Sequence, residues 1–238
     1  MASRIHKWEK FTARTFLAAI TVFLFIALTG CGDDDHYYDD CYDCWPPTYG
    51  TVILSDPAYD GDIRRDPGTG LYTIAQGNTE SVYVGIDPAT GAESRAFLYF
   101  PLRDIDGIPP YAVIVSATID MVISSIVPQP LVDTIPIRID LVSLQPPTLV
   151  GTDFDRTLQP ALATTTISPP ISQADFGNHI VVDVTPLLIE AQRLGLANFQ
   201  IRILREEILP VSPGRIEIND TTGANRAELA PLLKVTYF

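Results

Sequence analysis

Short apolar runs separated by Pro, Gly, Asn and Asp dominate the chain from about residue 51 onward, with hardly any helical periodicity. The run 137–141 has isoleucine or leucine at every second position, with Arg138 and Asp140 between them, and the run 199–203 has the same pattern. Period-two alternation is typical of a strand with one buried face and one wet face. An antiparallel all-β fold is therefore expected.

Nine apolar runs have strand length, or the length of two strands in the case of 113–126. They are 52–55, 81–86, 95–100, 113–126, 135–144, 180–184, 199–204, 215–218 and 232–238. One short helix is expected over 186–194, because Pro186 suits a first turn and Gly195 suits a stop. About 9–10 strands with one helix predict a jelly-roll-like antiparallel β-sandwich over residues 50–238. An outer-membrane barrel is the alternative, but its strands of about ten residues do not match these short runs.

Residues 1–30 are typical of a signal peptide, with a basic start, an apolar run over 16–28 and a small-residue exit. As a helix the apolar run would extend about 20 Å, short of the roughly 30 Å hydrocarbon core of a bilayer. The sequence Leu-Thr-Gly-Cys at 28–31 resembles the lipobox of bacterial lipoproteins. Cleavage before Cys31 and acylation of its sulfur are therefore expected, which would anchor the chain to a lipid membrane. Gly32, where an aspartate would favour inner-membrane retention, favours the outer membrane in a Gram-negative host.

The expected mature chain is strongly acidic. Removal of residues 1–30 would change the formal net charge from −13 to −16, because four basic residues and Glu9 are lost. Such a surface repels nucleic acid and anionic lipid headgroups. Six aspartates fall within 33–43, so residues 31–49 are expected to form an extended, solvated tether.

The tether also carries aromatic residues and a Cys-x-x-Cys pair, Cys41 and Cys44. A local disulfide in an oxidising compartment is the leading interpretation of this pair. A redox pair and half of a zinc site are the alternatives, and His36 is the other nearby nitrogen ligand. The tether itself would act as a spacer, or as an aromatic or metal-binding strip.

Four segments carry a family resemblance. They are Glu-Ser-Arg-Ala-Phe-Leu-Tyr-Phe at 93–100, Ser-Ala-Thr-Ile at 116–119, Val-Asp-Val-Thr at 182–185 and Ala-Pro-Leu-Leu-Lys-Val-Thr-Tyr at 230–237. With the Ile-Pro turn at 108–109, this order resembles the DNRLRE-type domain from about residue 56 to the end. The resemblance implies a jelly-roll-like sandwich of secreted and surface proteins, related to carbohydrate-binding modules. The chain departs from the family in having no tryptophan after Tyr49.

No complete catalytic constellation is visible, so no catalytic residue is predicted. Beyond the signal peptide the histidines are His36 and His179, the latter expected at an exposed strand end, and neither a Gly-x-Ser-x-Gly elbow nor a His-Glu-x-x-His helix occurs. A glycoside hydrolase needs only two facing carboxylates. Candidates for such a pair are Glu93, Glu206, Glu207 and Glu217.

Two groups of residues are candidates for ligand contact. Four carboxylates near the start of the domain could form an oxygen-rich calcium loop, or could cap turns: Asp56, Asp60, Asp62 and Asp66. Three tyrosines in loop-like sequence could stack on a sugar: Tyr59, Tyr72 and Tyr111. The expected function is a membrane-anchored, non-catalytic binding or adhesion module, with polysaccharide as the candidate ligand. The alternatives are a structural envelope protein with a protein partner and a glycoside hydrolase.

Overall fold

The computed structural model describes residues 46–103, 107–127, 134–206 and 213–238. The predicted signal peptide, Cys31, His36 and the pair Cys41 and Cys44 lie outside the described residues. The domain is one compact unit, Pro47–Phe238. No described helix is long and apolar enough to cross a bilayer.

Nine strands of the domain follow one another in a continuous hydrogen-bonded path. In spatial order they are β1 (Tyr49–Leu54), β12 (Leu232–Tyr237), β6 (Ile114–Val127), β11 (Gly214–Asn219), β4 (Ser81–Ile86), β5 (Glu93–Pro101), β10 (Asn198–Arg205), β7 (Ile137–Val142) and β8 (Ala163–Thr166).

Three further strands and four short helices complete the described domain. Strand β2 (Gly61–Arg65) pairs with β5 and with β3 (Tyr72–Gln76), and β9 (His179–Asp183) pairs with β6. The helices are η1 (Gly151–Phe154), η2 (Gln173–Asp175), α2 (Thr185–Arg193) and α3 (Arg226–Leu229). Every strand pair is antiparallel, so the predicted all-β antiparallel class is confirmed.

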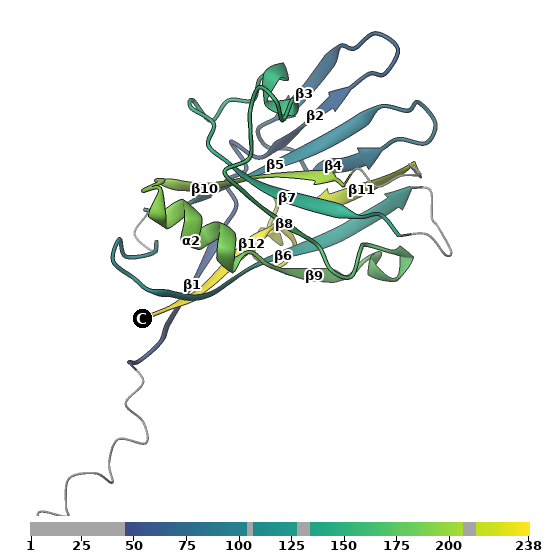
Figure 1. The fold of residues 1–238 in the computed structure, drawn as a ribbon. Helices are drawn as coiled ribbons and strands as arrows, with labels where there is room; N and C mark the ends of the chain where they lie inside the picture. The colour runs from purple at the N-terminus through teal and green to yellow at the C-terminus, as the bar shows by residue number, and fades with distance from the viewer. Residues whose placement is uncertain (1–45, 104–106, 128–133, 207–212) are drawn as a thin grey trace, which may run out of the picture. The chain divides into compact units, whose positions relative to one another are not determined.

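The sheet curls around its own core because β6 belongs to both of its parts. Residues 114–122 of β6 pair with β12 and β9, whereas residues 123–127 pair with β11. The part containing β1, β12 and β9 therefore faces the part containing β4, β5, β10 and β7, and α2 lies beside the core between β10 and β6 (Figure 1). The prediction of two strands over 113–126 is wrong, because ladder partners run along the whole of one 14-residue strand.

The inner core, which lies within the curl, is apolar. Strand β10 contributes Phe199, Ile201 and Ile203, each at most 1% exposed. The predicted helix is α2, and its Leu187 and Leu188 are fully buried against the same core. Full burial of one such side chain contributes about 1.5–3 kcal/mol, so this inward alternation stabilises the curl of the sheet.

The outward face of the same strands is also covered, which the sequence pattern did not predict. A second apolar cluster joins β2, β5 and β7 to the segment 143–162 between β7 and β8; its members are Ile63, Phe97, Val142, Leu144, Leu149 and Phe154. We call this segment, together with the β2–β3 hairpin, the outer layer. Asp140 and Arg202 are fully buried beneath it, so the expected wet face of β7 and β10 is wrong.

Candidate binding pocket

Buried polar side chains hold the outer layer on the sheet. Segment 143–162 is mostly irregular, so its backbone groups need partners other than a strand ladder. Gln200 Oε1 accepts from Leu144 N at 2.8 Å, and Arg202 Nη1 donates to Asp153 O at 2.8 Å. The polar residues of the β10 alternation therefore satisfy the backbone of the segment that covers them.

The register of β2 places an arginine beside a tyrosine on the outer face. Arg65 lies opposite Tyr72 of β3 and opposite Glu93 of β5, and directly paired residues share a face of the sheet. Arg64 falls on the other face of the strand, where its Nη2 donates to Thr90 Oγ1. Strand alternation thus separates two adjacent arginines and directs only one of them to the outer layer.

Phe154, at the end of η1, links the hairpin to β5. Its ring centroid lies 5.4 Å from that of Tyr72, and the guanidinium carbon of Arg95 stands 4.0 Å above its centroid. Arg95 also donates to Phe154 O, and its Nε donates to Glu93 Oε1 at 2.8 Å. Arg95 is thereby fixed as a buried cation between an aromatic ring and a carboxylate, an arrangement that guanidinium geometry favours.

One buried carboxylate orients two further arginines. Oδ2 of Asp140 accepts from Arg202 Nη2 at 2.8 Å and from Arg156 Nε at 3.1 Å. Burial lowers the pKa of the Arg202 guanidinium, and the hydrogen bond from Asp140 opposes that effect. The Arg156 side chain is 38% exposed, and its terminal nitrogens bond to no residue in the described part of the chain.

These side chains line a pocket of about 290 Å³ whose walls are the hairpin and the end of η1. The lining residues are Arg65, Tyr72, Arg95, Phe154, Asp155, Arg156 and Thr157. Backbone and hydroxyl hydrogen bonds from Thr157 lower the pKa of Asp155, which therefore stays ionised. This pocket, which we call the arginine pocket, combines one half-exposed aromatic residue with an excess of cationic donors.

The close approach of the Tyr72 ring requires a glycine at position 151. A Cβ atom at this position would lie 2.9 Å from Cδ2 of Tyr72, closer than packed carbon atoms approach each other. Gln76, at the other end of β3, donates to Pro147 O and accepts from Leu149 N, both at 2.9 Å. The outer layer therefore positions the Tyr72 ring from both ends of its strand.

The three predicted contact tyrosines lie in different places. Tyr72 was expected in a loop, but it is the first residue of β3 and lines the arginine pocket. Tyr59 lies in a turn with its ring packed 4.8 Å from that of Tyr99. Tyr111 is 96% exposed in the connection before β6. Among the three, Tyr72 alone lines the arginine pocket.

The four predicted calcium ligands do not share one loop. Asp56 and Asp66 cap turns: Asp56 accepts from Ala58 N, and Asp66 accepts from Gly68 N and Thr69 N. Asp62 is buried on β2, and burial raises its pKa to about 6. Across the described ranges no three acidic, cysteine or histidine side chains gather closely enough to hold a metal ion.

Asp60 is buried at 0% exposure in a separate cluster. Its Oδ1 accepts from Tyr99 N at 2.8 Å, and its Oδ2 lies 3.9 Å from Arg226 Nη2. Burial and the nearby Asp220 carboxylate raise the pKa of Asp60 well above its ordinary range. The cation facing this pair is thus a guanidinium, which ties α3 to the β1–β2 turn.

The carboxylates considered for hydrolysis are engaged by other side chains. Glu93 pairs with Arg95, Glu206 pairs with Arg138 at 3.2 Å, and Glu217 accepts from Ser81 Oγ at 2.7 Å; Glu207 lies outside the described residues. His179 begins β9, is exposed as expected, and lies 2.8 Å from Asp120, whose other oxygen accepts from Lys234 at 2.7 Å.

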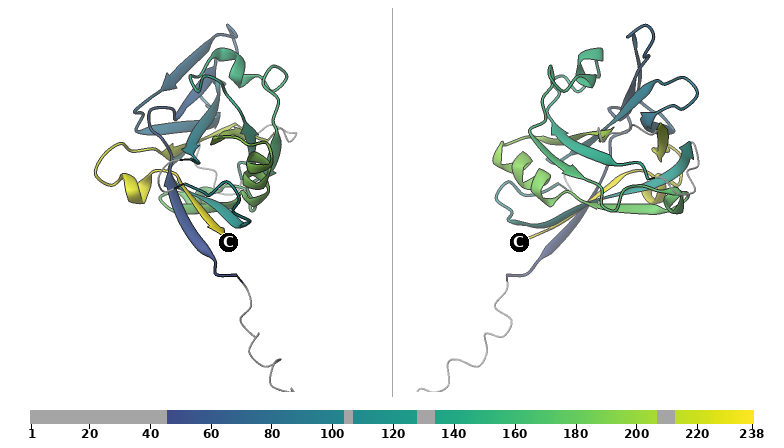
Figure 2. Two further views of the ribbon diagram at one scale, coloured as in Figure 1. Left: turned by 90° about the vertical axis from the view of Figure 1, so that its left-hand side faces the viewer. Right: turned by 45° about the vertical axis from the view of Figure 1, so that its right-hand side comes forward.

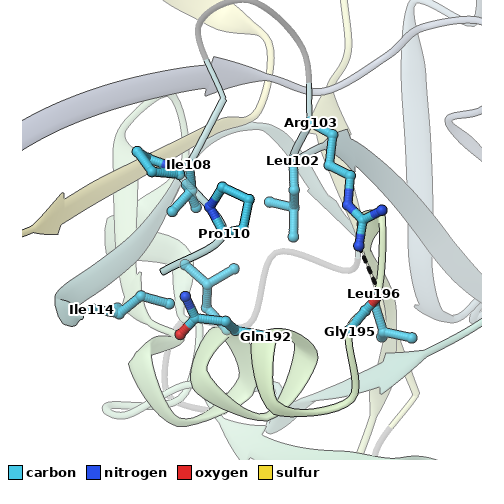
Figure 3. A pocket seen from close by; sticks show the side chains of 10 residues that line it. Leu102, Arg103, Ile108, Pro110, Ile114, Gln192, Gly195 and Leu196 are labelled. Atoms are coloured by element: carbon cyan, nitrogen blue, oxygen red, sulfur yellow. Dashed lines mark hydrogen bonds between the residues drawn. The ribbon is translucent and has the colours of Figure 1, made fainter. Parts of the chain in front are cut away.

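A second pocket, of about 190 Å³, is mainly apolar and lies between α2 and the segment that follows β5 (Figure 3). Its one charged lining residue is Arg103, whose Nη2 donates to Gly195 O at 3.1 Å. The arginine pocket differs because its cationic donors still face open space. We therefore take the arginine pocket as the candidate functional site.

No protein-family model matches the chain, and it has no match among the curated proteins. What the domain binds is therefore inferred from the side chains of the pocket.

Proposed function

We propose that the chain is an envelope lipoprotein whose β-domain is a non-catalytic binding module for polysaccharide, held at the membrane through acylated Cys31. The arginine pocket with its half-exposed Tyr72 ring carries this proposal. The DNRLRE-type resemblance supports it, because that domain is related to carbohydrate-binding modules.

The pocket has the mixture of groups that suits a sugar. A flat ring 41% exposed offers its face to the C–H side of a pyranose, and guanidinium and hydroxyl groups offer donors to its oxygens. Ligand pockets span roughly 300–1,000 Å³. The volume of about 290 Å³ lies just below this range and suits one sugar unit of a longer chain.

The position of the hairpin also supports a contact role. Tyr49 of β1 pairs with Tyr237 of β12, so the start of the domain lies beside its C-terminal end. The β2–β3 hairpin projects at the opposite end of the domain (Figure 2). The arginine pocket therefore lies away from β1, the strand that begins the domain, and a ligand can reach it without contacting that strand.

The test is a comparison of two tyrosine variants of the full chain in detergent, titrated with polysaccharide fractions from bacterial envelopes. Tyr72→Ala should weaken binding by at least about tenfold, as central aromatic contacts do. Tyr111→Ala, which removes a more exposed ring outside the pocket, should leave the affinity unchanged. Absence of binding to every fraction, or equal losses in the two variants, would refute the proposal.

A protein partner is the second candidate, favoured by the outward face of β1 and β9. Val52 and Leu54 of β1 and Val181 of β9 are 57%, 36% and 61% exposed, and each of these two strands has one paired neighbour among the described strands. Exposed apolar side chains on strands with a free edge are typical of surfaces that pair with another chain. Crosslinking in the membrane, repeated with Val181→Lys, would reveal such a partner through loss of one specific adduct.

A further inference from the structure

We infer that the arginine pocket selects sugar units that carry a carboxylate, so that the ligand is an acidic polysaccharide built from uronic acids. This inference rests on the proposed function and deepens it. It depends on which of the arginine donors in the pocket remain free.

Two arginines in the pocket retain unused donors. Arg65 is exposed, its ladder partner Glu93 is engaged by Arg95, and Arg65 makes no hydrogen bond or ion pair with the residues that the structure describes. Arg156 uses Nε on Asp140, which fixes the direction of its side chain and leaves its terminal nitrogens open. A guanidinium with adjacent free N–H groups matches the two oxygens of a carboxylate.

The remaining charges of the pocket keep the site cationic. Arg95 is paired with Glu93, and buried Arg202 is paired with Asp140, so these charges are largely compensated. Asp155 is the one acidic residue that lines the pocket, against the unpaired charge of Arg65 and the partly shared charge of Arg156. A neutral sugar would leave Arg65 without a counter-charge and the terminal nitrogens of Arg156 without an acceptor, whereas a uronate would supply both.

The acidity of the whole chain does not oppose this contact. The formal net charge is −13, but beyond about 8 Å at physiological salt the field of distant carboxylates is largely screened. Counting the lining residues and their direct partners, four guanidinium groups stand against the carboxylates of Glu93, Asp140 and Asp155, so the site has one positive charge in excess. A ligand that meets the protein at the pocket alone is therefore favoured over one that lies along a long stretch of its surface.

The experiment uses the full chain in detergent and matched pairs of oligosaccharides. Oligogalacturonate, oligoglucuronate and oligomannuronate are each compared with their carboxyl-reduced, neutral counterparts by calorimetric titration. At least one acidic form should bind about 10- to 100-fold more tightly than its neutral counterpart, because a hydrogen-bonded ion pair is lost on reduction.

Adjacent arginines provide the matched variants. Arg65→Gln should remove about tenfold of the affinity for the acidic form and little of that for the neutral form. Arg64→Gln removes the same charge from the other face of β2 and should change neither. Because Arg65 is exposed, its substitution tests recognition without endangering the fold.

The outcomes separate the two proposals. Equal binding of acidic and neutral forms, with loss in Tyr72→Ala, would overturn the acid selectivity and leave the sugar-binding function standing. Equal losses in Arg64→Gln and Arg65→Gln would also overturn it, because a general charge effect would then explain the binding. Binding of no acidic form would overturn the selectivity, and binding of no sugar at all would overturn both proposals.

Discussion

The inner core and the outer layer are built on opposite faces of the same strands, yet different interactions hold them together. On β10 the inward side chains are Phe199, Ile201 and Ile203, which belong to the apolar cluster of the inner core. The outward side chains include Gln200 and Arg202, which are just as buried but bond to loop backbone and to Asp140. One strand therefore supports both a packed interior and a polar foundation for a loop.

This difference gives the two regions different roles. Apolar packing is non-directional and stabilises the curl as a whole. Charge-assisted hydrogen bonds are directional, and they fix Arg95 and Arg156 at defined positions around the pocket. A buried ion pair contributes little net stability compared with apolar packing, so its main effect here is on geometry.

The largest predicted effect is on the inner core. Phe199→Ala should lower the free energy of unfolding by about 3–5 kcal/mol, because it leaves a cavity beside Phe100, whose ring centroid is 6.2 Å away. Phe176→Ala, at a phenylalanine that is 49% exposed, is the matched control and should cost about 1 kcal/mol or less. Denaturant unfolding of the full chain measures both, and similar losses would contradict the assignment of the core.

A somewhat smaller loss of stability is expected when the buried polar contacts beneath the outer layer are removed. Arg202→Met should destabilise the domain by about 3 kcal/mol, because Asp140 loses its fully buried partner and Asp153 O loses a donor. Adding Asp140→Leu should recover part of that loss. Arg193→Met removes an exposed pair with Glu190 and should leave the stability almost unchanged. If the double variant were less stable than Arg202→Met, the ion pair would not be the cause.

A buried acid at the base of the hairpin should make stability depend on pH. Burial raises the pKa of Asp62 from 3.8 to about 6, so between these values the folded state binds more protons than the unfolded state. Stability therefore falls as the pH rises through this window. Asp62→Asn should gain about 2 kcal/mol relative to the wild type between pH 4 and pH 7, measured by denaturant unfolding.

Asp66 is the control, because the pKa of its carboxyl is shifted in the opposite direction. Hydrogen bonds from Thr69 and Gly68 lower its pKa, so its contribution is retained at neutral pH and is lost in acid. Asp66→Asn should therefore become less stable relative to the wild type as the pH rises. Equal pH profiles for the two variants would contradict the assigned burial of Asp62.

The smallest expected effect is a change of recognition without unfolding. Gly151→Ala should displace the Tyr72 ring and weaken sugar binding about threefold to tenfold, while the unfolding midpoint changes little. The control is Gly50→Ala on β1, where an added Cβ meets only an ordinary contact. Gly177 is unsuitable as a control because its φ is positive, so an alanine there would strain the backbone. Unchanged affinity in Gly151→Ala would show that the ring position does not determine binding.

The inward alternation made the strands of the inner core predictable. The runs 81–86 and 199–204 coincide closely with β4 and β10, because buried isoleucine, valine and phenylalanine determine those positions. Strands β2, β3 and β8 were missed: β2 is Gly-Asp-Ile-Arg-Arg, β3 is largely exposed, and β8 is rich in threonine. Ladder partners, not local pattern, hold these three in place.

Only one of the residues that line the arginine pocket could be predicted from the sequence. Tyr72 was a candidate because of its type, but Arg65, Arg95 and Arg156 are far apart in the sequence and meet only when segment 143–162 folds over the outward face of the sheet. In most sheets, the polar residues of an alternating strand face solvent. On β7 and β10 they face a loop that covers them, and only the three-dimensional structure distinguishes the two cases.

The most direct test of the account is hydrogen–deuterium exchange of the full chain with and without a bound polysaccharide. The account predicts new protection in the β2–β3 hairpin and in residues 150–158, with the inner core unchanged. Protection on the outward face of β1 and β9, with none at the hairpin, would contradict the arginine pocket as the binding site.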